Sequence, residues 1–185
     1  MTIHEALEVL SVHRRDQIVI ATMSAVGIWP SLSDTEADFS YIPSTMGQGP
    51  NLGLGLALSQ KKRRVIVING DGCMLMNLGC LATIADNPAD LCTIVLNNGI
   101  YEVTGGQRTA GGGTTRFAEV ARACGIEQSY RFTDTEEWRR AAAAVLEERG
   151  PVFIELVVEP RYGQATPLSP RAMNEQIERL RRAIV

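Results

Sequence analysis

The sequence predicts an α/β protein of three layers (αβα), in which helices cover both faces of a central, mostly parallel β-sheet. Two observations carry this prediction. Runs of Val, Ile and Leu that read as buried strands alternate with helix-sized segments along the chain. One strand–helix–strand unit, over residues 65–96, also requires a crossover that leaves its two strands parallel. With 185 residues, we expect a single domain over residues 1–185 with a core of its own.

The first half of the chain contains two segments with clear signals. Thr2 is a candidate N-cap before the first apolar face. Gly53 and Gly55 lie inside a later helix, and since glycine costs a helix about 1 kcal/mol relative to alanine, their use predicts close packing against the sheet, a partner subunit or a ligand. The expected elements are a helix at 2–14, a strand at 17–21, a possible helix near 25–33 with Pro30 near its start or at a break, an extended segment at 39–42 and a helix at 51–60.

The second half continues the alternation of strands and helices. Its expected elements are a strand at 65–69, a helix at 74–85, strands at 91–96 and 128–131, helices at 116–124 and from Asp134 to about Arg149, a strand at 152–158, a linker at 160–170 and a C-terminal amphipathic helix at about 170–184. Between them lies a glycine-rich stretch at 98–115. A loop this long without apolar periodicity is usually functional or disordered.

Composition excludes several classes of function. The formal net charge is −3, and the one dense basic run, residues 61–64, precedes a strand, so we expect a solvated loop and no nucleic-acid binding. No apolar stretch is long enough to span a membrane, and charged residues interrupt the first apolar positions, unlike a signal peptide. The four cysteines form no Cys-x-x-Cys pair, which favours buried thiols in the cytoplasm. His4 and His13 are expected at the surface or an interface.

Polar residues follow two neighbouring strands of the predicted sheet. Gly70-Asp71-Gly72 comes after the run at 65–68, and Asn97-Asn98 after the run at 93–96. Because adjacent parallel strands end at the same edge of a sheet, both turns should lie together. An Asp carboxylate and an Asn amide oxygen suit a hard cation such as Mg²⁺ that also binds phosphate oxygens. A Gly-Asp-Gly alone is common in turns, and the alternative is an ordinary βαβ unit with polar turns.

This pattern resembles the thiamine diphosphate (ThDP) fingerprint of the pyrophosphate-binding domain of ThDP-dependent enzymes. The resemblance implies that the Asp71 and Asn98 side chains and the Ile100 carbonyl are the protein ligands of Mg²⁺, while Asn97 stabilises the turn. Gly72 would let the chain approach the diphosphate, and the helix expected near Cys73 would offer free N–H groups. The contacts implied in this region are Gly70, Asp71, Gly72, Cys73, Asn98, Ile100 and Tyr101.

Two further segments resemble cofactor-binding parts of the same family. The loop after the first strand supplies hydroxyls to the diphosphate in relatives, which makes Thr22 and Ser24 candidates; alternatively they cap the next helix. The segment beginning at Ser44 resembles the one that grips the aminopyrimidine. There the Ser44 carbonyl would accept from the 4′-amino group, and Met46 would hold the cofactor in its bent shape. Without the resemblance, Met46 would be interpreted as a loop methionine that fills space in the hydrophobic core.

One catalytic group required by the family is missing. Formation of the reactive ylid needs a glutamate at the pyrimidine N1′, carried by a second, pyrimidine-binding domain. A chain of 185 residues is too short for both domains, and Glu119, Glu136 and Glu155 lie elsewhere in the expected fold. We therefore expect another polypeptide, a pyrimidine-binding α subunit of similar size, in an α₂β₂ or larger assembly.

The segments at 74–79, 97–101 and 104–107 resemble the sulfopyruvate and phosphonopyruvate decarboxylases. The resemblance implies the β subunit of a two-chain 2-oxo acid decarboxylase acting on a small anionic substrate. Glu102 departs from that branch, which usually has glycine there. The stretch 104–115 would act as a flap, with Thr104, Gln107 and Arg108 meeting the anionic head group. Alternatively, Arg108 is solvated in a mobile loop.

Three other functions stay open at this point. A carboligase or synthase would use the same decarboxylated intermediate. A non-catalytic subunit would only hold the cofactor, although the intact Asp71/Asn98 pair argues against it. A nucleotide-binding Rossmann domain is superficially suggested by the glycines at 47–53, but their spacing is wrong and no convincing strand precedes them.

Overall fold

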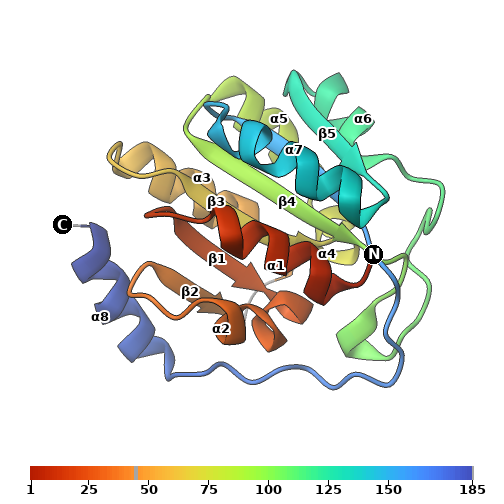
Figure 1. Ribbon diagram of the computed structural model, residues 1–185, viewed down its shortest axis with the longest axis horizontal. Coiled ribbons are helices and arrows are strands. Elements are labelled where there is room, and N and C mark those ends of the chain that lie inside the picture. The colour runs from red at the N-terminus through yellow and green to blue at the C-terminus, as the bar shows by residue number, and fades with distance from the viewer. Residues whose placement is uncertain (44–45, 185) are drawn as a thin grey trace.

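The computed structural model describes residues 1–43 and 46–184, and it consists of a six-stranded parallel β-sheet between two layers of helices (Figure 1). The strand order is β2-β1-β3-β4-β6-β5, and every neighbouring pair is parallel. The strands are β1 (Ile18–Thr22), β2 (Asp38–Tyr41), β3 (Val65–Gly70), β4 (Leu91–Asn97), β5 (Gln128–Phe132) and β6 (Val152–Val157). The predicted three-layer αβα class is confirmed.

Side chains alternate between the two faces of the sheet, and each face has its own core. Ile66 and Ile68 of β3 pack with α1 (Ile3–His13) and α7 (Thr135–Glu147), whereas Val65 and Val67 pack with the helices of the opposite layer. That layer contains α3 (Gly49–Ser59), α4 (Asp71–Met76), α5 (Cys80–Asp86) and α6 (Phe117–Ala123). Parallel strands buried on both faces explain the near-continuous apolar runs in the sequence.

Most helix boundaries fall within two residues of the prediction, and both expected N-caps form. The Thr2 hydroxyl accepts from the Glu5 N–H at 3.2 Å in a capping box, and the Asp134 carboxylate accepts from the first turn of α7. Where one helix was expected near 25–33, the chain forms a 3₁₀ turn, η1 (Met23–Gly27), and a short α2 (Trp29–Leu32). Pro30 lies in the first turn of α2, where proline is tolerated.

The helix expected at 74–85 is wrong in two respects. It begins earlier, at Asp71, so the acidic residue of the motif lies in the first turn of α4 and not in the loop before it. It is also two helices, because the backbone leaves the helical region at Asn77, whose side chain donates to the Gly47 carbonyl at 3.1 Å. An asparagine that bonds to distant backbone in this way competes with the helix.

Glycine packing against the sheet is confirmed at Gly53, whereas close packing of Gly55 against a partner subunit or a ligand stays a prediction. A Cβ on Gly53 would lie 2.4 Å from Val67 Cγ2, so α3 approaches the sheet too closely for any side chain there. Gly55 has nothing within 4 Å of such an atom. The basic run at 61–64 is also only partly solvated, because Arg64 is 8% exposed and its Nε lies 2.8 Å from Asp90 Oδ1.

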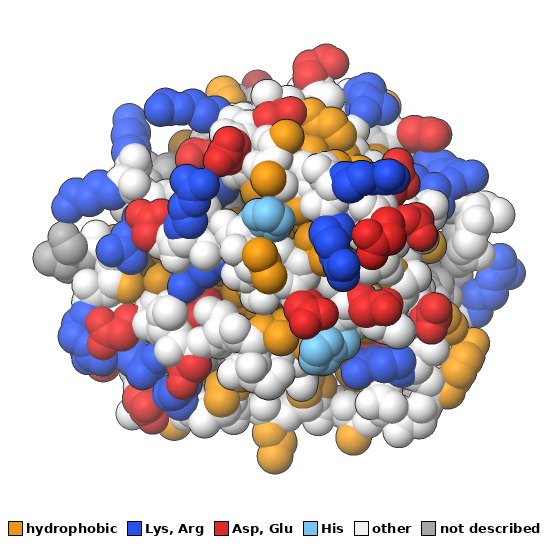
Figure 2. Space-filling model, in the orientation of Figure 1, with side chains coloured by type: hydrophobic (Ala, Val, Ile, Leu, Met, Phe, Trp, Pro, Cys, Tyr) orange, Lys and Arg blue, Asp and Glu red, His pale blue; other side chains and the backbone are white. Residues whose placement is uncertain are grey.

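Charged side chains of both signs are interspersed on the face of the molecule that carries α1 (Figure 2). Figure 2 also shows histidine side chains on this face. His4 is exposed and His13 is half-buried. Cys73, Cys80, Cys92 and Cys124 are all free thiols, and the first three are buried. Within the described residues, every helix is too short or too polar to cross a lipid bilayer.

The C-terminal helix α8 (Met173–Ile184) lies beside the edge strand β2, at the end of a long irregular segment (Figure 1). Gln176 Oε1 accepts from the Ser40 N–H at 2.8 Å and so covers the open edge of β2. Arg171 and Arg179 both pair with Asp34, at 2.6 and 3.1 Å, and Arg182 pairs with Glu36. These charged pairs therefore add to the apolar packing of α8, in which Leu180 is buried in the core.

We expect Asp34→Asn to loosen α8 selectively. The hydrogen bond from Arg171 lowers the pKa of Asp34, so its contribution to stability is present above the ordinary value of 3.8 and is lost as the pH falls below it. Hydrogen-exchange mass spectrometry at neutral pH should show α8 amides exchanging several-fold faster, with β3 and β4 unchanged. Asp86→Asn, on the exposed end of α5, is the charge-matched control. Unchanged exchange in α8 would show that the ion pairs are dispensable.

Candidate functional site

The two polar turns lie together at the carboxyl edge of the sheet, as predicted from the strand order. β3 and β4 are direct neighbours, with Gly70 opposite Leu96, so Asp71 and the Asn97–Asn98 turn follow adjacent strand ends. They border a cavity of about 40 Å³, well below the roughly 300–1,000 Å³ of a typical ligand pocket. The cavity lining consists of Ile3, Thr22–Ala25, Met46, Gly70–Cys73, Leu96, Asn98 and Ile100–Thr104. This edge therefore carries a small cavity that both polar turns border.

Asp71 places a buried carboxylate at the centre of this edge. The residue is 3% exposed, and its Oδ2 accepts from the Gly99 N–H at 3.1 Å and from the Thr109 hydroxyl at 2.9 Å. Burial raises the pKa of Asp71, and these hydrogen bonds only oppose that effect in part. Among the described residues, the ion pairs of the structure leave Asp71 without a cationic partner. Its charge is available to an external cation.

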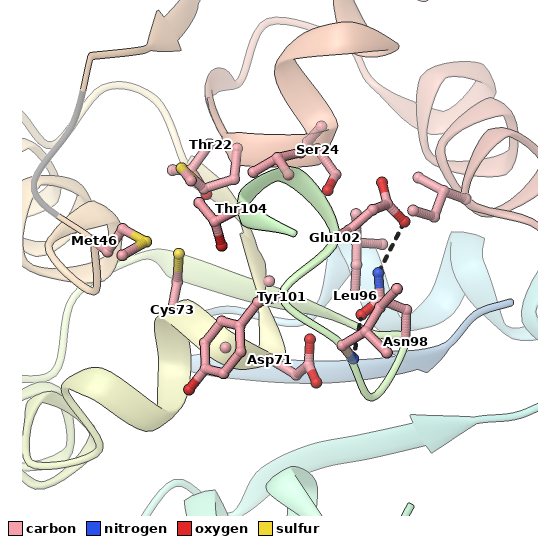
Figure 3. A pocket seen from close by; sticks show the side chains of 17 residues that line it. Thr22, Ser24, Met46, Asp71, Cys73, Leu96, Asn98, Tyr101, Glu102 and Thr104 are labelled. Atoms are coloured by element: carbon pink, nitrogen blue, oxygen red, sulfur yellow. Dashed lines mark hydrogen bonds between the residues drawn. The ribbon is translucent and has the colours of Figure 1, made fainter. Parts of the chain in front are cut away.

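Asn98 and Ile100 flank Gly99, whose N–H bonds to Asp71, and both line the cavity. Asn98 Nδ2 donates to Glu102 Oε2 at 2.9 Å, and its Oδ1 accepts from the Ile100 N–H at 3.0 Å (Figure 3). The Asn97 side chain points elsewhere and donates to the buried Glu155 at 2.8 Å, consistent with a role in holding the turn. One carboxylate, one amide oxygen and one main-chain carbonyl form a donor set that suits Mg²⁺. No group of three or more His, Cys, Asp or Glu side chains in the described parts of the chain offers a rival metal site.

Gly72 lacks a side chain because Tyr101 occupies the space beside it. A Cβ at position 72 would lie 2.6 Å from the Tyr101 ring. The glycine was expected to let the backbone approach a phosphate. In this structure the close neighbour is an aromatic ring that itself lines the cavity, so Gly72 and Tyr101 belong to the same wall.

Thr22 and Ser24 both reach the cavity lining. The Thr22 hydroxyl lies 3.0 Å from the Ile68 carbonyl and 3.1 Å from Asn69 Oδ1. Its proton is therefore donated to an acceptor within the core. The alternative, that these residues cap the following helix, is not realised at Thr22, which makes no side-chain cap to η1. Between them, Met23 has a φ of 45°, a left-handed conformation that is uncommon for a non-glycine residue.

Met46 and Cys73 both line the cavity. Figure 3 shows their sulfur atoms close together at one end of it. Burial raises the pKa of Cys73, so this thiol stays protonated at neutral pH. Ser44, the expected aminopyrimidine contact, lies outside the described residues.

The glycine-rich stretch is folded back on itself next to the site. Ile100 and Arg108 form an antiparallel bridge, and the Tyr101 N–H donates to the Gln107 carbonyl at 2.8 Å. Thr104 lines the cavity, whereas Gln107 and Arg108 are exposed outside it. The Arg108 guanidinium donates to the Gly112 carbonyl within its own loop. Of the three expected substrate contacts, the structure brings only Thr104 to the cavity.

Two residues at this site gave no signal in the sequence. Thr109 bonds to Asp71 across 38 residues, and Arg161 pairs with Glu102 across 59 residues. Neither belongs to a motif, and both contacts depend on how the loops after β4 and β6 fold. Glu102 lines the cavity, and its bond to Asn98 likewise has no counterpart in any sequence motif.

A parallel αβα domain with a buried carboxylate and a neighbouring amide at its carboxyl edge belongs to the class of open α/β domains that bind ligands at the ends of their strands. The chain matches the family described as thiamine pyrophosphate enzyme, C-terminal TPP binding domain, over residues 21–156. It belongs to that family. This membership decides against the nucleotide-binding Rossmann alternative.

The curated relatives include proteins named as decarboxylases and proteins named as decarboxylase subunits. The chain is 39% identical to a phosphonopyruvate decarboxylase of Streptomyces viridochromogenes over 131 residues, which are 70% of this chain and 32% of that protein. It is 36% identical to the sulfopyruvate decarboxylase subunit beta of Methanococcus maripaludis over 166 residues, 86% of this chain and 85% of that subunit. The chain thus spans about a third of the first relative and most of the second.

Solved structures agree on the fold. A thiamin diphosphate-dependent enzyme from Mycobacterium smegmatis superposes with a TM-score of 0.69 at 21% identity, covering 86% of this chain and 32% of that one. Benzoylformate decarboxylase from Polynucleobacter necessarius gives a TM-score of 0.68 at 19% identity, covering 91% and 34%. At this level of identity the likeness supports the αβα fold.

Proposed function

We propose that this chain is the ThDP- and Mg²⁺-binding β subunit of a two-chain decarboxylase that acts on a small anionic 2-oxo acid. The observation that carries the proposal is the buried Asp71 carboxylate beside Asn98 at the ends of two adjacent strands. Family membership supplies the cofactor class, and the relatives with matching length are named as decarboxylase β subunits.

In this proposal the chain's own residues have distinct tasks. Asp71, Asn98 and the Ile100 carbonyl hold Mg²⁺, which neutralises the diphosphate and offsets the cost of burying the Asp71 charge. Thr22, Ser24 and the backbone at Gly70–Cys73 line the diphosphate, and Ser44 and Met46 support the aminopyrimidine. When bound, ThDP supplies a nucleophilic carbon and an electron sink for the loss of CO₂. Apolar side chains such as Leu96 and Val103 exclude water from the same wall.

We assign the other wall to a pyrimidine-binding α subunit that contributes the glutamate at N1′. The small volume of the cavity, about 40 Å³, supports this assignment because the cofactor needs a second surface. The beta-subunit names of the relatives fit a two-chain enzyme. We place the complex in the cytoplasm, where the four free thiols would stay reduced.

Substrate recognition is assigned to Thr104 at the cavity and to Gln107 and Arg108 in the adjoining loop. In the structure Arg108 bonds to its own loop, so contact with an anionic head group requires the 104–115 stretch to rearrange when substrate binds. A guanidinium suits a sulfonate or phosphonate geometrically.

Calorimetry tests the proposal. ThDP with Mg²⁺ is titrated into this chain alone and into the complex with the protein encoded beside it, and ATP with Mg²⁺ serves as the control ligand. We expect tight ThDP binding only in the complex, and 2-oxo acid decarboxylation by that complex. Tight binding of ATP, or a complex that does not bind ThDP, would contradict the proposed function.

A further inference from the structure

Glu102 is a buried carboxylate that the proposed cofactor chemistry does not use. Its side chain is 2% exposed and lines the cavity. Its Oε2 accepts from Asn98 Nδ2 at 2.9 Å, while its Oε1 accepts from Arg161 Nη2 at 2.7 Å. The main-chain N–H of Arg161 also approaches Oε2, at 3.3 Å. A buried carboxylate with this many partners is held in one orientation.

This carboxylate and the Ile100 N–H together determine which way the Asn98 amide faces. An ionised carboxylate only accepts hydrogen bonds, so it can pair only with the NH₂ end of the amide. Oδ1 is then directed away from Glu102, toward the Ile100 N–H. If the amide turned by 180°, its NH₂ group would face the Ile100 N–H, which is also a donor, and its oxygen would face the Glu102 carboxylate. The amide oxygen would then no longer be available to a cation. An amide nitrogen has no lone pair to offer a cation.

Arg161 is the counter-ion of Glu102. It lies on the irregular segment that leads from β6 to α8, and Figure 3 shows Glu102 turned toward Asn98 at the side of the cavity. Thr166 of the same segment donates to the Val103 carbonyl at 3.0 Å. Two contacts therefore join this segment to the turn that carries Glu102, and one of them is an ion pair.

We propose that Glu102 is a positioning residue that directs Asn98 Oδ1 toward the Mg²⁺ site, with Arg161 as its counter-ion. This inference rests on the proposed function, since it assigns Asn98 to the metal. The role is exerted through a hydrogen bond and not through charge.

A matched pair of variants separates the hydrogen bond from the charge. Glu102→Gln/Arg161→Ala keeps an acceptor for Asn98 Nδ2, whereas Glu102→Ala/Arg161→Ala removes it, and both lose the same two charges. Calorimetric titration of Mg²⁺ into the assembled complex with saturating ThDP should give a Kd within about threefold of the parent for the first variant. The second should bind roughly 10- to 100-fold more weakly, the usual effect of losing a residue that orients a metal ligand. Equal Mg²⁺ affinity in the two variants would overturn the proposal.

A second pair of variants tests the contact between Asn98 and Glu102 by changing its chemistry while both side chains keep their length. Asn98→Asp sets two carboxylates against each other at the 2.9 Å contact, so Mg²⁺ should bind at least about tenfold more weakly despite the added charge. Adding Glu102→Gln supplies a donor to the new carboxylate and should restore the affinity. If Asn98→Asp alone binds Mg²⁺ as tightly as the parent, Glu102 does not position residue 98. If the parent complex binds neither Mg²⁺ nor ThDP, the proposed function fails instead.

Discussion

Replacing Asp71 with alanine should abolish Mg²⁺-dependent binding of ThDP. Asp71 is the carboxylate at the cavity that has no cationic partner among the described residues, because Glu102 is already paired with Arg161. Loss of a residue that only supports a metal ligand weakens binding by roughly 10- to 100-fold, so loss of the charged ligand itself should exceed about 100-fold. Calorimetry of the assembled complex measures the affinity, and decarboxylation at saturating cofactor measures the turnover.

Asp71→Asn is the matched control for this prediction, because it keeps an acceptor for Gly99 and Thr109 and removes only the charge. Burial raises the pKa of Asp71 in the folded protein, so the ionised form costs stability once the pH is above the ordinary value of 3.8. The cofactor-free variant should therefore melt at a higher temperature than the parent at pH 7, although it no longer binds Mg²⁺. A lower melting temperature, or retained Mg²⁺ affinity, would contradict the role of Asp71.

Met46→Ala should lower turnover far more than it lowers cofactor affinity. The diphosphate end is held by the metal site, whereas Met46 lines the opposite end of the cavity beside Cys73. If its side chain maintains the bent shape of the cofactor, truncation misplaces the reacting atoms, and a misplacement of about 1 Å can reduce kcat roughly 100-fold. Steady-state kinetics and ThDP titration of the assembled complex measure the two effects separately.

Two substitutions control the Met46 experiment. Met46→Leu keeps nearly the same apolar volume and should retain most of the turnover. Met76→Ala removes a methionine that is 49% exposed, outside the cavity lining, and should leave both parameters unchanged. A Met46→Ala enzyme with weak cofactor binding but normal turnover would show that Met46 anchors the cofactor and does not shape it.

The parts of the fold set by local pattern could be predicted from the sequence. The apolar runs at β3 and β4 identify buried parallel strands, and the rules of βαβ connection then place Asp71 and Asn98 at one edge. Capping residues such as Thr2 and Asp134 fixed two helix starts within a residue. These features need no knowledge of distant contacts.

The parts that depend on tertiary contacts could not be predicted. The break between α4 and α5 follows from a bond between Asn77 and Gly47, 30 residues apart. The partners of Asp71 and Glu102, Thr109 and Arg161, lie in irregular segments with no periodic signal. The motif located the ligands of the candidate site, but the residues that orient those ligands became visible only in the folded chain.

The most direct test is anomalous diffraction from crystals of the assembled complex grown with ThDP and Mn²⁺, a substitute for Mg²⁺ with a usable signal. We expect one manganese peak at bonding distance from an Asp71 carboxylate oxygen, the Asn98 amide oxygen and the Ile100 carbonyl, with the diphosphate on its open side. Well-ordered coenzyme with manganese bound elsewhere, or with these three oxygens left uncoordinated, would contradict the central claim.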